Sequence, residues 1–139
     1  MKGKTIQEMT VGESASFAKT VTETDIYLFA AISGDFNPAH INEVEASKSM
    51  FGKRIAHGLL SSGFISAALG TQLPGPGTIY LGQNLKFVRP VGIGDTVTAT
   101  VTVTELLPEK NRAVLETVCV NQNGEEVITG TATVMPPKA

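Results

Sequence analysis

The sequence is short of residues that several classes of protein require. It has one cysteine in 139 residues, Cys119, so an internal disulfide and a thiolate metal cluster are both excluded. Cys119 lies in an alternating apolar segment, and we interpret it as a small buried hydrophobic residue that suits a reducing cytosol. There are only two histidines, His40 and His57, and they do not have the spacing of a metal-binding motif. We therefore expect no zinc or iron site.

Charge of either sign is also scarce. Eleven Lys and Arg against 13 Asp and Glu give a net charge of −2, with no run of one sign and no basic stripe for a phosphate backbone. A nucleic-acid partner is therefore not expected. With 42% hydrophobic and 17% charged residues, the chain should form a globular fold, and its length suits one domain over 1–139. The first residues lack the apolar stretch of a signal peptide, so we expect a cytoplasmic protein.

The longest run without charge, residues 55–85, is interrupted by glycine, serine and proline, so we expect no membrane span. Its first part, 58–69, is apolar on nearly every side. Such a helix belongs in the centre of a fold. Its small residues would let neighbouring backbone approach closely.

Periodicity predicts helices in the first half of the chain and strands mainly in the second. The alternation of valine and alanine with threonine over 95–107 is the clearest strand signal. We expect strands at 14–21, 78–87, 95–107, 112–121 and 125–135, and helices at about 22–33, 42–49 and 58–69, with a polar loop over 34–41. The strands of the second half should form an antiparallel meander with a hairpin turn at 121–124. This predicts an α+β domain whose sheet wraps the central helix, and whose open edges are covered by a second copy in a homodimer.

The polar loop carries the strongest signal for chemistry. Asp35 and His40 lie five residues apart across a turn that contains Asn37 and Pro38. A carboxylate and an imidazole at this spacing can converge on one water molecule and transfer protons near neutral pH. On spacing alone, the alternative is that Asp35 braces the turn and His40 is a surface residue.

The loop and its surroundings resemble the signature of the MaoC-like, (R)-specific enoyl-CoA hydratases. The likeness rests on Ser33-Gly34-Asp35, Asn37-Pro38, His40 and Ala46, and on a second block from Gly52 to Ser61. It extends over roughly residues 5–135 and implies a hot-dog fold, usually in a homodimer. Ala39 departs from the bulkier aliphatic residue more common in that family, which affects the expected shape of the acyl pocket.

The resemblance implies the residues of a site for an enoyl thioester of coenzyme A, with no metal and no redox cofactor. Asp35 and His40 would act on a water molecule, and Asn37 would orient the loop or that water. The start of the central helix at Gly58 would stabilise negative charge on the thioester oxygen. The remaining candidates are His57 as a loop brace or substrate contact, Ser62 beside the thioester carbonyl or packed under the sheet, and Lys53, Arg54, Lys86 and Arg89 for the phosphates.

Three other functions use the same fold. A dehydratase acting on acyl carrier protein would run the same chemistry towards loss of water. A hot-dog thioesterase would hydrolyse the thioester instead, and an accessory subunit would bind acyl-CoA without turnover. Asp35, Asn37 and His40 together favour hydration over the last two.

Overall fold

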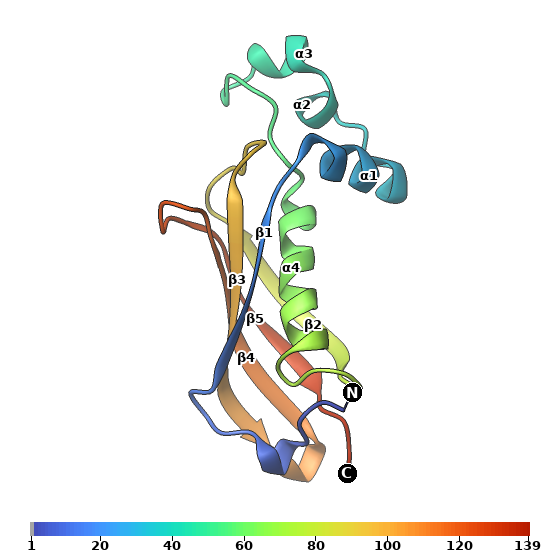
Figure 1. Ribbon diagram of the computed structural model, residues 1–139, viewed down its shortest axis with the longest axis vertical. Coiled ribbons are helices and arrows are strands. Elements are labelled where there is room, and N and C mark those ends of the chain that lie inside the picture. The colour runs from blue at the N-terminus through green and yellow to red at the C-terminus, as the bar shows by residue number, and fades with distance from the viewer. Residues whose placement is uncertain (1) are drawn as a thin grey trace.

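A five-stranded antiparallel sheet wraps around one long helix in the computed structural model, which describes residues 2–139 (Figure 1). The strands are β1 (Ser14–Thr20), β2 (Ile79–Phe87), β3 (Thr96–Leu107), β4 (Arg112–Val120) and β5 (Glu126–Met135). The central helix is α4 (Gly58–Thr71), and short 3-10 turns lie at Ile6–Glu8 and Pro108–Lys110. This is the α+β, hot-dog arrangement predicted from the sequence. Among residues 2–139, no helix is both long and apolar enough to cross a bilayer.

The sheet has the strand order β1-β3-β4-β5-β2. Strands β3, β4 and β5 form the predicted meander, with the hairpin turn at 121–124. The prediction that β2 also joins it in sequence order is wrong, because β2 pairs with β5 at the far edge. The segment between β2 and β3 pairs with residues 55–56, through Ala56 N–H to Val91 O and a bridge between Ile55 and Gly92. This crossing carries the chain from one side of the sheet to the other.

Helix α4 is central because its apolar residues meet the inner face of the sheet. Phe64, Ile65 and Leu69 are buried, and the alternating side chains of β3 that face them, such as Val97 and Val101, are fully buried. Burying one such side chain contributes about 1.5–3 kcal/mol relative to leaving it exposed. The helix begins at the predicted residue and ends two residues beyond the predicted Leu69.

Three short helices lie beyond the end of the sheet at which α4 begins, opposite the two chain termini (Figure 1). They are α1 (Glu23–Ser33), α2 (Pro38–Ile41) and α3 (Glu43–Ser47). The side chain of Thr22 caps α1, and Gly34, with a φ of 81°, ends it. Helix α2 lies in the segment expected to be a loop. The sequence features that favour this helix are Asn37 as its N-cap and Pro38 at its first position. Its four residues are too few to reveal a helical repeat of apolar side chains.

Candidate active site

A cavity of about 420 Å³ opens where the start of α4 meets the segment between α1 and α2. Its walls are largely apolar and include Phe29, Phe87 and Val91. The polar groups that line it include Asp35 and His40, so the two residues singled out in the sequence share one cavity. A mainly apolar cavity with a few convergent polar groups is typical of a small-molecule site.

Asp35 is held in an exposed turn immediately after α1. Its N–H donates to the hydroxyl of Ser33 over 3.1 Å, and its own Oδ1 accepts from the N–H of Asn37 over 3.1 Å. The side chain of Asn37 in turn accepts from the N–H of Ala39 over 3.0 Å and so caps α2. Asn37 therefore shapes the loop, one of the two roles predicted for it.

His40 enters the cavity from α2 and is nearly buried. Its Nδ1 lies 2.7 Å from the carbonyl oxygen of Ile55. Because a carbonyl only accepts, Nδ1 must carry the proton of this bond, and Nε2 of the neutral ring keeps its lone pair. His40 is thus oriented as a proton acceptor at Nε2.

His57 immediately precedes α4 and is only 2% exposed. Its Nε2–H donates to the backbone carbonyl of Asp35 over 2.9 Å. Its ring stacks on the ring of His40 with centroids 3.9 Å apart. The ring of Phe29 also contacts it, with centroids 4.7 Å apart. These contacts are those of a loop brace, because they tie the backbone of Asp35 and the ring of His40 to the start of α4.

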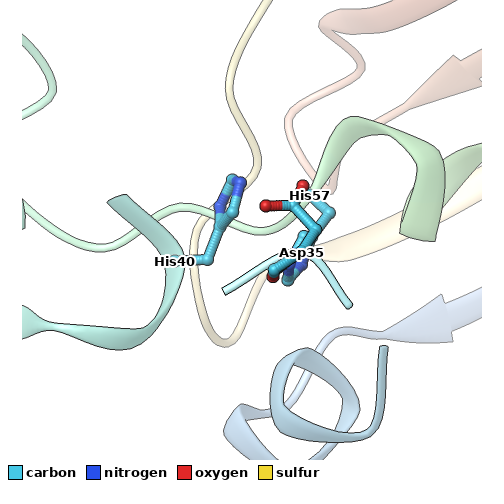
Figure 2. Close-up of side chains that lie close together, drawn as sticks. All are labelled: Asp35, His40 and His57. Atoms are coloured by element: carbon cyan, nitrogen blue, oxygen red, sulfur yellow. Dashed lines mark hydrogen bonds between the residues drawn. The ribbon is translucent and has the colours of Figure 1, made fainter. Parts of the chain in front are cut away.

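The side chains of Asp35, His40 and His57 gather at one point, with potential ligand atoms within 4.8 Å of one another (Figure 2). A metal ion bound by two imidazoles must lie close to the plane of both rings. Here the rings face each other with an angle of 30° between their planes, so their lone pairs lie in nearly parallel planes. This arrangement suits a stacked pair better than a shared metal ion.

The start of α4 presents free backbone donors to the cavity. Within the described chain, no acceptor bonds the N–H of Gly58 or Leu59. These groups and the helix dipole favour negative charge at this end. Gly58 also makes room for Phe87, since a Cβ at position 58 would lie 2.5 Å from that ring.

The two serines near this end face different surroundings. The hydroxyl of Ser62 donates to Leu59 O over 2.8 Å, and Ser62 lines a separate hollow between α4 and β2. Ser61, which the sequence analysis did not select, lines the cavity with the catalytic candidates. The structure therefore does not bring Ser62 into the cavity that Asp35 and His40 line, because one residue along a helix turns the side chain by about 100°.

Arg54 does not line this cavity either. Its side chain is 12% exposed, and its guanidinium pairs with Glu23 at 2.8 Å and Glu43 at 2.9 Å and donates to the Tyr27 hydroxyl over 2.9 Å. Its bond to Glu23, with further contributions from Glu43 and Tyr27, raises the pKa of Arg54. Its charge thus joins α1 and α3 to the segment before α4.

The other three cations differ in their distance from the cavity. Arg89 lines it and contacts Glu125 at 3.4 Å, with a bond to the carbonyl of Glu126 at 3.0 Å. Lys53 and Lys86 are exposed and do not line the cavity. Arg89 is therefore the best placed of the four predicted cations.

Comparison with known proteins places the chain among enzymes of enoyl-CoA chemistry. Residues 6–132 match a family described as MaoC like domain. The chain is 60% identical to an (R)-specific enoyl-CoA hydratase of Rhodospirillum rubrum, covering 94% of this chain and 90% of that protein. It is 46% identical to a 3-hydroxybutyryl-CoA dehydratase of Methylorubrum extorquens, over 95% of this chain and 83% of that one. The unliganded R-hydratase PhaJ1 from Pseudomonas aeruginosa superposes with a TM-score of 0.93 at 47% identity, covering 99% and 88% of the two chains.

Proposed function

The chain belongs to the MaoC-like domain family, and we propose that it is an (R)-specific enoyl-CoA hydratase. This hydro-lyase adds water reversibly to a trans-2-enoyl-CoA and gives an (R)-3-hydroxyacyl-CoA. The observation that carries the proposal is the presence of Asp35 and His40 in one largely apolar cavity. The names of the R. rubrum and P. aeruginosa relatives support the same reaction.

Asp35 and His40 hold the reacting water in this proposal. The water oxygen bonds to C3 as one of its protons passes to an acceptor of the pair, and the C2=C3 π electrons move towards the thioester. A proton from the pair then bonds to C2, so one water is consumed and the pair is restored. Both transfers occur on one face, which makes the addition syn. The unprotonated Nε2 of His40 and the Asp35 carboxylate are the two proton acceptors. General acid–base catalysis of this kind contributes about 10²–10⁴-fold to the rate.

The thioester oxygen gains negative charge as water attacks C3. The free N–H of Gly58 at the start of α4 is the proposed donor to this oxygen. Loss of one preorganised donor of this type costs about 2.7–4 kcal/mol in the barrier. Arg89, which lines the cavity, is the proposed contact for the phosphates of coenzyme A.

The edge strand β2 supports the proposed homodimer. It pairs on one side with β5, and Ile79, Tyr80 and Leu81 are 54%, 40% and 45% exposed. An open edge with large apolar side chains is commonly covered by another chain, and a second copy meets this need. We place the protein in the cytoplasm, where its one free thiol would stay reduced.

The test is hydration of crotonyl-CoA and longer enoyl-CoAs. The reaction is monitored as the loss of enoyl-thioester absorbance, and chiral analysis identifies the configuration of the product. Asp35→Asn and His40→Gln should each lower kcat by about 10²–10⁴-fold with the melting temperature retained. Glu45→Gln, an exposed carboxylate on α3 outside the cavity, should match the unmodified protein. Release of free thiol from saturated acyl-CoA without hydration would overturn the proposal in favour of a thioesterase. Turnover on acyl carrier protein alone would overturn the choice of carrier.

A further inference from the structure

Ser61 carries a buried hydroxyl with no hydrogen-bond partner in the described part of the chain. The residue is 1% exposed, and its Oγ is buried. Helical hydroxyls usually bond back to their own helix, as Ser62 does to Leu59 O over 2.8 Å and Thr71 to Ala67 O over 2.6 Å. A buried hydroxyl without a partner costs free energy, so the donor of Ser61 needs an acceptor that arrives from elsewhere.

The position of Ser61 directs this donor towards the start of α4. Gly58 and Ser61 are three residues apart, so they lie on one side of the helix, and both line the cavity. Side chains on a helix lean towards its N-terminus, so the hydroxyl of Ser61 covers the turn that begins at Gly58. The free N–H of Gly58 also points out of this end. An acceptor at the mouth of the helix can therefore meet both donors.

The nearby protein acceptors leave the hydroxyl free. His57 Nδ1 is also buried without a partner, yet it makes no hydrogen bond with Ser61. The Asp35 carboxylate and the Ile55 carbonyl line the same cavity, but they accept from Asn37 N–H and from His40 and not from Ser61. A carbonyl oxygen of a bound molecule is the acceptor that fits a lone hydroxyl donor beside a free N–H.

We propose that the hydroxyl of Ser61 is a second hydrogen-bond donor to the thioester oxygen of the substrate, beside the N–H of Gly58. This inference rests on the proposed hydratase function and adds a residue to it. The bond strengthens as negative charge develops on the oxygen, so Ser61 lowers the barrier more than it tightens binding of the ground state.

The kinetic test compares Ser61→Ala with Ser62→Ala as the matched control. Ser61→Ala should lower kcat for crotonyl-CoA by about 10²-fold with a smaller change in KM, whereas Ser62→Ala should stay within about twofold. Ser61→Cys keeps the shape and a weak donor, so its kcat should lie between those of the alanine variant and the unmodified protein. Thermal melting of each variant shows whether it is folded. A folded Ser61→Ala protein with unchanged kcat would overturn the proposal.

A second readout does not depend on turnover. Butyryl-CoA labelled with ¹³C at the thioester carbonyl has no double bond to hydrate, and its carbonyl stretch reports donors at the oxygen. Binding to the unmodified protein and to Ser62→Ala should lower the stretching frequency, and Ser61→Ala should return it towards the value in solution. An equal shift in all three proteins would refute the role of Ser61. If no protein hydrates any enoyl thioester but the shift still depends on Ser61, the hydratase function fails and the donor role stands.

Discussion

His57 offers the sharpest test of how the site is held together, because it contacts both proposed catalytic residues. Its Nε2–H donates to the Asp35 carbonyl over 2.9 Å, and its ring stacks on His40 at 3.9 Å. Two substitutions separate these contacts. His57→Phe keeps an aromatic ring and loses the donor, whereas His57→Gln keeps a donor near the position of Nε2 and loses the stack.

The expected magnitudes follow from the exposure of the groups involved. Loss of the hydrogen bond from His57 to the Asp35 carbonyl should lower the free energy of unfolding by about 1 kcal/mol. This is the lower end of the range for a group left without its partner, because water can reach the exposed turn of Asp35. Loss of the stack costs about 0.5–1.5 kcal/mol. For a domain of this size, 1 kcal/mol corresponds to about 3–4 °C in melting temperature. Both variants should therefore remain folded at 25 °C.

Activity should separate the two variants more than stability does. Without the tether from position 57, the Asp35 turn keeps its local bonds to Ser33 and Asn37 but loses its link to the start of α4, and a misplacement of the carboxylate by about 1 Å can cost about 10²-fold in rate. We expect His57→Phe to lose about 10²-fold in kcat and His57→Gln to retain more activity. Steady-state hydration of crotonyl-CoA and thermal melting measure both effects. Equal kcat for the two variants, or unmodified kcat in folded His57→Phe, would refute the reasoning.

Three further predictions concern the scaffold. Hydrogen bonds from Tyr27 and Arg54 lower the pKa of Glu23. These bonds therefore stabilise the fold at a pH above the ordinary pKa of a glutamate, and their contribution to stability decreases as the pH falls below it. Arg54→Met should lower the melting temperature at pH 7, and the difference should become smaller as the pH falls below the ordinary pKa of a glutamate; a constant difference would contradict this. Burial raises the pKa of the Cys119 thiol to about 12. Iodoacetamide at pH 8 should therefore label the native protein about a thousandfold more slowly than protein unfolded in urea. Equal labelling rates would contradict the burial of this thiol. Gly130→Ala would place a Cβ 2.1 Å from a backbone oxygen of β2, and urea unfolding should show a loss of about 1–3 kcal/mol, whereas an unchanged midpoint would contradict this close approach.

Local patterns predicted the elements well where the repeat was long. The alternation in β3 and the apolar run of α4 both gave the observed structure to within a few residues. Helix α2 was missed because its four residues span barely one turn. The position of β2 was missed because strand pairing depends on where the crossing segment around Val91 travels, and that path leaves no periodic signal in the sequence.

In the site too, local sequence predicted some features, and contacts between distant residues decided others. Asp35, Asn37 and His40 lie close together along the chain, so their spacing and the family motif were enough to select them. His57 was selected without its main contact, since its stack on His40 joins residues 17 positions apart, one in α2 and the other just before α4. Arg54 was a candidate for the phosphates, and nothing in the sequence indicated that Glu23 and Glu43, which come from α1 and α3, pair with it.

The sequence by itself determined the α+β fold, its central helix and the closeness of Asp35 and His40, because each depends on residues near one another in the chain. Only the tertiary structure decided which serine faces the cavity. Ser61 and Ser62 are adjacent and chemically identical, and a turn of about 100° places one in the cavity and the other in a separate hollow. The rotation of α4 against the sheet is set by packing over its whole length, which no local motif encodes.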